Sequence, residues 1–170
     1  MLRTAFGVAS AMILLLGCGG NRVKNSEVIW RPFDSPEGKF GIELPGDHRT
    51  TYSQQGDIAV TTLNVPFPDK DFSVSVGRLL AVDIDLLAPI RELAKAHNGN
   101  IVTTGKPGQR FYGHPGREFE IEVEKPRRGF ASGRILIADG KIYQILAIGE
   151  AMQLSDPLVQ RFLNSFTIAK

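Results

Sequence analysis

Hydrophobic and polar residues alternate most regularly between residues 116 and 149, where the pattern predicts three consecutive antiparallel strands. In the first strand, apolar residues alternate with glutamates, as expected for a strand with one buried face and one wet face. The apolar positions are Phe119, Ile121 and Val123, and the glutamates are Glu118, Glu120, Glu122 and Glu124. Asp139-Gly140 joins the next two apolar runs and predicts a tight hairpin, because both residues tolerate the positive φ of a type I′ turn.

The predicted turn also fixes how the two strands that it joins are paired. With Ala138 opposite Lys141, one face of the hairpin is largely apolar and the other is mixed. The expected partners are Ile137 with Ile142, Ile135 with Gln144, Gly133 with Leu146, Ala131 with Ile148, Leu136 with Tyr143, Arg134 with Ile145 and Ser132 with Ala147. A loop from Pro126 to Arg128 then sets Glu120 of the first strand opposite Arg134.

Alternating segments elsewhere in the chain predict further strands. The expected segments are 28–33, which is an edge strand or a lead into the domain, 39–44, 57–66, 71–80, an interrupted strand over 100–105 and 109–112, and a short strand at 167–168. The second hairpin, 57–80, turns at Pro68-Asp69-Lys70 and is rich in the β-branched residues that strands favour.

Two segments have the helical period instead. Residues 86–97 are predicted to form the first helix, with Asp83 or Asp85 as its N-cap and Asn98-Gly99 as its stop. Pro89 is tolerated only near the first turn, so the regular helix is predicted to begin close to Ala88. The second helix has Ser155 as its N-cap. It carries one apolar stripe, made of Val159, Phe162, Leu163 and Phe166.

These elements predict an α+β domain. Its centre is an antiparallel sheet of about six to seven strands, and two main helices give an αβα sandwich with both faces of the sheet covered. The chain of 170 residues is long enough for one such domain and too short for two. We expect it to occupy residues 28–170.

The N-terminus predicts an export signal. Arg3 is followed by an apolar run of about a dozen residues, too short to span a bilayer but typical of a signal peptide over residues 1–17. Leu15-Leu16-Gly17-Cys18 resembles a bacterial lipobox, although Leu16 stands where a small residue is commoner. The lipobox resemblance implies that Cys18, the only cysteine, is diacylated and becomes the first mature residue. The alternative is a plain secretory leader with an incidental cysteine.

Residues 18–27 have almost no apolar content and predict a flexible tether between the lipid anchor and the domain. Anchoring at Cys18 would hold the protein on the extracytoplasmic, periplasmic side of a membrane. Gly19 and Gly20 follow without an aspartate, which by the sorting convention of Gram-negative lipoproteins favours the outer membrane over the inner one.

The charged residues argue against one class of partner and indicate one candidate binding surface. Removing Arg3 from the 20 basic residues leaves 19 against 18 acidic ones, so nothing favours nucleic acid as a partner. The local basic cluster comprises Lys125, Arg127, Arg128 and Arg134, together with Phe130, and is expected at the tip of the hairpin that joins the glutamate-rich strand to the next strand. Such a tip could contact anionic lipid headgroups or an acidic protein partner, and the alternative is a plain solvated turn. The glutamate row is expected to be solvated, with Arg134 and Arg117 as partners.

The pattern of reactive residues predicts no catalytic, metal or cofactor site. His48, His97 and His114 lack the spacing of a zinc site, and the sequence contains no nucleophile elbow, P-loop or dinucleotide-binding motif. We expect His48 in an exposed loop, His97 at a helix end and His114 in a turn. The alternative is a small-ligand binder or hydrolase whose groups, such as Asp47, His48 and arginines, converge only in the folded chain.

Several motifs together resemble the PsbP-like family, in particular its bacterial lipoproteins. They are FDSPEGKFGIELPG, a mid-chain helix ending at a glycine, GHPGREFEIEV, RILIADGKIYQILAIG and FLNSF, and they cover roughly residues 33–167. The resemblance implies an αβα sandwich and, in photosynthetic members, an extrinsic subunit or assembly factor of photosystem II. No metal or photosystem contact carries over residue by residue. The sequence therefore predicts a non-catalytic, lipid-anchored envelope protein with an unidentified protein partner.

Overall fold

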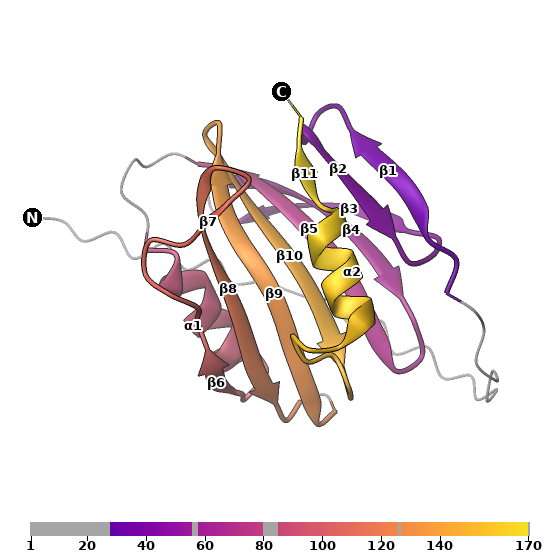
Figure 1. Cartoon of the computed structure of the whole chain (residues 1–170), viewed down its shortest axis with the longest axis vertical. Helices are drawn as coiled ribbons and strands as arrows, with labels where there is room; N and C mark the ends of the chain where they lie inside the picture. The colour runs from indigo at the N-terminus through magenta and orange to yellow at the C-terminus, as the bar shows by residue number, and fades with distance from the viewer. Residues whose placement is uncertain (1–27, 56–57, 80–84, 126, 170) are drawn as a thin grey trace, which may run out of the picture.

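The computed structural model describes residues 28–55, 58–79, 85–125 and 127–169 (Figure 1). Cys18, the signal peptide and the tether expected at residues 1–27 lie outside this part of the chain. The described elements are β1 Arg31–Ser35, β2 Phe40–Leu44, β3 Arg49–Gln55, β4 Ile58–Pro66, β5 Lys70–Arg78, α1 Leu87–Ala96, β6 Asn100–Thr103, β7 Arg110–Phe111, β8 His114–Val123, β9 Gly129–Ala138, β10 Lys141–Gly149, α2 Pro157–Ser165 and β11 Thr167–Ile168.

The described strands form two antiparallel sheets instead of the expected single one. The large sheet has eight strands in the order β3-β4-β5-β10-β9-β8-β6, with β7 paired to β8, and the small sheet has the order β1-β2-β11. The prediction of one sheet with six to seven strands was therefore wrong. The small sheet forms a separate layer because β2 buries Phe40, Ile42 and Leu44 against the large sheet and α2.

Each face of the large sheet has its own hydrophobic core. On one face, α1 packs through Ile90 and Leu93 against a cluster that includes Phe119, Ile121 and Ile135. On the other face, which we call the front, α2 and the small sheet cover β4, β5, β9 and β10 (Figure 1). The two expected helices on an antiparallel sheet are thus confirmed, with the small sheet as an additional part of the front layer.

The predicted pairing of the central hairpin is confirmed. Ala138 lies opposite Lys141, Ile135 opposite Gln144, and all the other expected pairs are found. Asp139 and Gly140 both have positive φ, +49° and +70°, as a type I′ turn requires.

The predicted register of β8 was wrong by two residues. Arg134 lies opposite Glu118, and Glu120 lies opposite Ser132. The reason is that β8 ends at Val123, because the backbone N–H groups of Glu124 and Lys125 donate to the His97 carbonyl beyond α1 instead of pairing with β9. A shift of two residues leaves the faces unchanged, so the apolar side chains of β8 still share the α1 side of the sheet.

The helices end where the sequence predicts but begin at different caps. The side chain of Asp85 accepts from the Leu87 N–H at 2.9 Å without occupying the N-cap position, and Asp83 lies outside the described residues. In α2 the N-cap is Asp156 and not Ser155, because Pro157 begins the helix and the Asp156 carboxylate accepts from the next two free N–H groups. All four residues of the predicted apolar stripe are buried.

Candidate functional site

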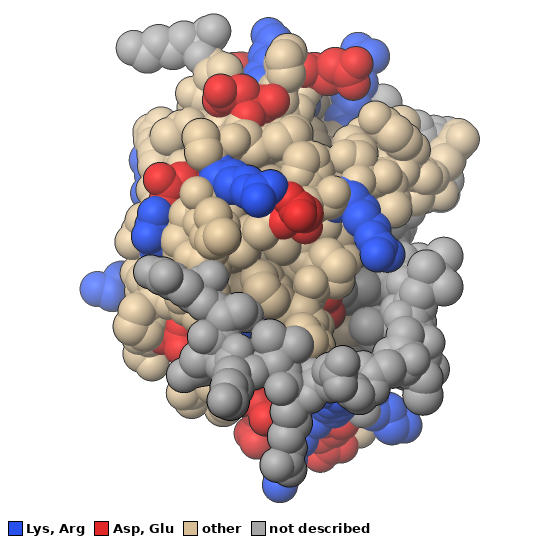
Figure 2. Space-filling view, turned by 90° about the vertical axis from the view of Figure 1, so that its right-hand side faces the viewer, with Lys and Arg blue, Asp and Glu red and all other residues tan. Residues whose placement is uncertain are grey.

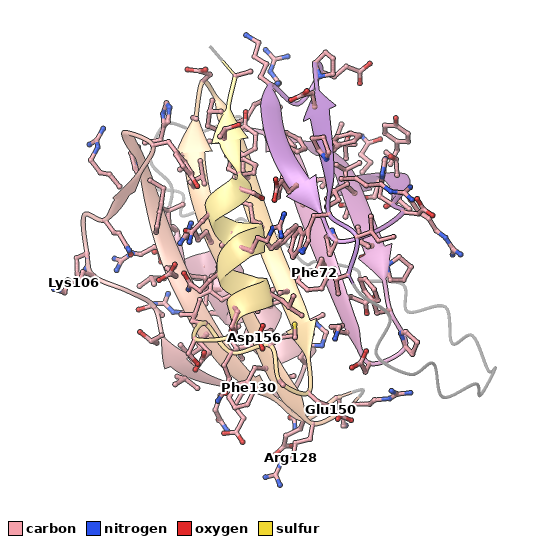
Figure 3. The ribbon with its side chains drawn as sticks, turned by 45° about the vertical axis from the view of Figure 1, so that its right-hand side comes forward. Phe72, Lys106, Arg128, Phe130, Glu150 and Asp156 are labelled. Carbon is pink, nitrogen blue, oxygen red and sulfur yellow. The ribbon has the colours of Figure 1, made fainter. Side chains whose placement is uncertain are left out.

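The basic cluster predicted at the hairpin tip is exposed and projects from one end of the domain. Lys125, Arg127 and Arg128 are all exposed, and none of them forms an ion pair with another described residue. Figure 3 shows Arg128 at the lower end of the molecule, pointing away from the body, with Phe130 and Glu150 close by. We call Lys125, Arg127 and Arg128 the basic tip.

One backbone contact and one side-chain contact join the basic tip to neighbouring segments. The Lys125 carbonyl lies 3.0 Å from Nδ1 of His97 at the end of α1, and Arg127 Nη1 donates to the Pro68 carbonyl at 3.0 Å. Phe130, the fourth member of the predicted cluster, is half-buried because it belongs to the β9 ladder opposite Gly149. Lys125 and Arg127 are thus each joined to a neighbouring segment, whereas the Phe130 ring is only partly available to a partner.

The chain enters the described domain at the same end as the basic tip. β1 begins beside the end of β2. Just after β2, Gly46 lies against Val65 and Phe67 at the end of β4. The turn that follows β4 contains Pro68, to which Arg127 donates. The start of β1, the β4–β5 turn and the basic tip therefore share one end of the molecule.

Arg134 does not belong to the basic tip, contrary to the prediction. Its side chain is only 10% exposed and lies on the front face, beneath the end of α2. The guanidinium donates to the Glu118 carboxylate at 2.9 Å, to the Leu163 carbonyl at 2.9 Å and to the Asn164 side-chain oxygen at 3.0 Å. Phe111 stacks on the guanidinium, 4.8 Å from ring centroid to Cζ. Arg134 thus fixes the C-terminal end of α2. Each of its three guanidinium nitrogens donates to a partner within the domain.

Tyr112 joins Arg134 at the same helix end. Its hydroxyl donates to the Leu163 carbonyl at 3.2 Å. Burial raises the pKa of Tyr112 above its ordinary value of 10.0, although the charge of Arg134 acts in the opposite direction. The phenol is therefore a neutral donor at physiological pH and carries no sign of an activated acid or base.

The glutamate row is not the solvated face that the sequence predicts. Glu118 and Glu120 are half-buried, since the segment before α2 and the helix itself lie over this face. Glu120 Oε2 accepts from the Leu154 N–H at 2.6 Å, which fixes that segment. Of the four, only Glu124 is exposed, and Asn98 donates to it at 2.6 Å. Each carboxylate other than Glu122 thus has a separate structural partner, and Arg117 pairs with none of them.

The three histidines lie in different elements, and each has its own structural surroundings. His97 is buried at the end of α1, His114 begins β8, and exposed His48 packs edge-on against Phe33 with 4.7 Å between ring centroids. Asp47 forms its ion pair with Arg31. Within the described ranges, no group of three or more His, Cys, Asp or Glu side chains could hold a metal ion. No described helix is both long enough and apolar enough to cross a membrane.

The side of the molecule that carries the small sheet has mixed charge. Figure 2 shows basic and acidic side chains interspersed there among uncharged ones. Exposed ion pairs account for part of this mixture, among them Arg161 with Glu43 at 2.9 Å. The basic tip differs from this surface because its cations are not paired with described carboxylates.

Comparison with solved structures establishes a PsbP-like fold. The chain resembles the solution structure of cyanobacterial PsbP (CyanoP) from Synechocystis, with a TM-score of 0.58 and 12% sequence identity over 91% of this chain and 98% of the other. A Pseudomonas aeruginosa protein of unknown function, described as a putative regulator, gives a TM-score of 0.37 and 12% identity over 71% of this chain and 83% of its own. That score is too low to carry an argument.

No protein-family model matches the sequence, and no curated protein matches it significantly. The family resemblance read from the sequence motifs is thus confirmed for the fold. Because the sequence identity is only 12%, the similarity to cyanobacterial PsbP shows the fold alone.

Proposed function

We propose that this chain is a non-catalytic module, anchored to an envelope membrane by lipid on Cys18, that binds a protein partner through the basic tip. The observation that carries the proposal is the tip itself, because three exposed cations lie close together in sequence, and the Lys125 backbone and the Arg127 side chain bind neighbouring segments. Exposed charges gathered in this way favour docking of a complementary surface. The PsbP-like fold is consistent with a module of this kind.

The position of the tip fits an anchor at Cys18. Residues 18–27 can span at most about 35 Å when fully extended. Because β1 begins at the end of the domain that carries the tip, acylated Cys18 would keep the tip close to the membrane surface. A partner embedded in or lying on that membrane is therefore within reach. Cys18 is followed by Gly19 and Gly20 and not by an aspartate, which supports the outer membrane as the location.

Site-specific photo-crosslinking tests this proposal. A photoreactive residue replaces Arg128 in the full-length, acylated chain, and irradiation is carried out in the native membranes. Lys106 is the matched control, since it is also an exposed cation in a loop but lies away from the tip (Figure 3). We expect one protein adduct from position 128 that is absent from position 106, and we expect Arg127→Glu to reduce its yield.

Two results would overturn the proposal. Equal adducts from both positions would show contact without specificity. Adducts with lipid alone would show that the tip contacts headgroups, to which each basic residue near the surface contributes about 1 kcal/mol.

A further inference from the structure

A pocket of about 180 Å³ lies at the other end of the front face from the basic tip. Its floor is formed by β4, β5 and β10, and its roof is the turn between β1 and β2. The apolar side chains of the floor include Ala59 and Val76, which are accessible, and Leu63 and Val74, which are buried beneath them. Lys141, at its edge, begins β10, whereas the tip lies beyond the other end of that strand, roughly 27 Å away for a nine-residue strand.

The roof of the pocket is fixed to its floor. Tyr143 is buried and donates its hydroxyl proton to the Gly38 carbonyl at 2.9 Å. Lys141 Nζ donates to the Glu37 carbonyl. Both bonds join the β1–β2 turn to β10, so the pocket is preformed and a ligand would not have to order it.

Two cations meet at the edge of this apolar floor. Arg78 and Lys141 both line the pocket and lie directly opposite each other on β5 and β10. Like charges directly opposite on antiparallel strands repel each other and destabilise the sheet. Neither forms an ion pair with a described carboxylate, and Glu37, which also lines the pocket, binds Lys141 through its carbonyl. Lys141 therefore has two further N–H donors for an anion.

An exposed aromatic side chain stands beside the pocket. Tyr52 lies opposite Thr61, and Thr61 lies opposite Val76, so the three side chains share the front face. Thr61 and Val76 line the pocket, and Tyr52 is 75% exposed. An aromatic ring at this position extends the apolar surface beyond the pocket itself.

The geometry points to a binding site for a small amphipathic carboxylate. Its anionic head would lie between Arg78 and Lys141 and relieve their repulsion, and its short apolar tail would lie against Ala59 and Val76. The volume corresponds to about six water molecules and is below the roughly 300 Å³ of pockets for drug-sized ligands, which limits the tail to a few carbons. This site is independent of the proposed partner-binding function.

Saturation-transfer NMR with hexanoate tests the site. The full-length chain is held in phosphatidylcholine nanodiscs, and empty nanodiscs give the blank. We expect saturable binding in which the terminal methyl protons of hexanoate receive the most saturation, because the tail lies on the apolar floor. Hexylammonium, which has the same tail and the opposite charge, should not bind.

Charge variants identify the residues that bind the head. Arg78→Gln and Lys141→Gln should each weaken hexanoate binding about tenfold, as expected for loss of one charge-assisted hydrogen bond. Lys95→Gln, an equal loss of charge at an exposed position on α1, should leave the affinity unchanged. Val76→Phe should fill the pocket and abolish the methyl signal while the circular dichroism spectrum is retained.

Three results would overturn the inference: no saturable binding, equal binding of hexylammonium, or affinities that Arg78→Gln and Lys141→Gln leave unchanged. None of them bears on the crosslinks from position 128. The two proposals can therefore fail separately.

Discussion

Arg134 on β9 and Glu118 on β8 form a largely buried ion pair across the two strands, with 2.9 Å between Nε and Oε1 and side-chain exposures of 10% and 24%. The same guanidinium donates to the Leu163 carbonyl near the end of α2. A cation at this position also interacts favourably with the negative end of the helix dipole. One side chain therefore joins two strands to a helix that follows them in sequence.

Removal of this side chain should destabilise the domain strongly. We expect Arg134→Met to lower the free energy of unfolding by about 3 kcal/mol, because it leaves Glu118 without its cation and removes one of the two donors to the Leu163 carbonyl. Urea denaturation measures the change. Arg91→Met is the control, since its ion pair with Asp85 is exposed and contributes less than about 1 kcal/mol. Equal losses in the two variants would contradict this role of Arg134.

The aromatic core beneath α2 should be equally sensitive. Phe162 is fully buried and packs edge-on against Phe72, with 5.1 Å between ring centroids. We expect Phe162→Ala to cost about 3–5 kcal/mol by thermal or urea unfolding, because it removes a whole ring and leaves a cavity. Phe130→Ala, at a half-buried position, should cost clearly less. An unchanged melting temperature for Phe162→Ala would mean that α2 is peripheral.

Gly133 is required because β10 passes too close for a side chain. A Cβ at this position would lie 2.2 Å from the Ile145 carbonyl oxygen and 3.0 Å from the Phe119 ring. We expect Gly133→Ala to cost about 2 kcal/mol, because the clash is with backbone that cannot move freely. Gly46→Ala should be close to neutral, since its Cβ would make only ordinary contacts at 3.4 Å and beyond. Comparison of the two urea midpoints tests the difference.

Asp71 should make stability depend on pH. Burial raises its pKa above the ordinary value of 3.8, so the ionised form is disfavoured in the folded chain. The carboxylate therefore destabilises the fold above its folded-state pKa, and this penalty disappears as the pH falls below 3.8. Asp71→Asn should raise the urea midpoint at pH 7 and give no gain at about pH 3. The more exposed neighbour Asp69→Asn should show a smaller gain, and equal gains would contradict the assignment to burial.

The proposed lipid anchor can be tested separately from the fold. In cells, Cys18→Ser should remove the acylation site, so the protein should no longer incorporate radiolabelled palmitate or enter the detergent phase of a Triton X-114 extraction. Treatment of membranes with high salt should then release the variant and leave the parent protein bound. Membrane retention of the variant after this treatment would rule out the anchor at Cys18.

The elements that the sequence predicts correctly are those specified by local chemistry. Asp139-Gly140 specifies one turn type, and that turn determines every pair of β9 with β10. The predicted apolar stripe has a strict helical period, and its four members are all buried, three of them on α2 and Phe166 at its C-cap. Such signals need no information about the rest of the chain.

The features that it does not predict depend on distant partners. Strand β3 was missed because Arg49–Gln55 is almost entirely polar, and it becomes a strand by pairing with β4 at the edge of the sheet. The glutamates of β8 have the pattern of a solvated face because the segment that covers them comes about 30 residues later in sequence, as the 34-residue separation of Glu120 and Leu154 shows. The pocket was missed for the same reason, since it joins the β1–β2 turn to Lys141.

The small sheet has a consequence for how the chain reaches its native state. β11 pairs with β2 through Thr167 and Gly41, which are 126 positions apart. During vectorial synthesis or passage through a secretion channel, the β1–β2 hairpin therefore emerges long before its third strand and leaves one edge open. Completion of this sheet must wait until nearly the whole domain has emerged, so the domain cannot finish folding before its last residues are available.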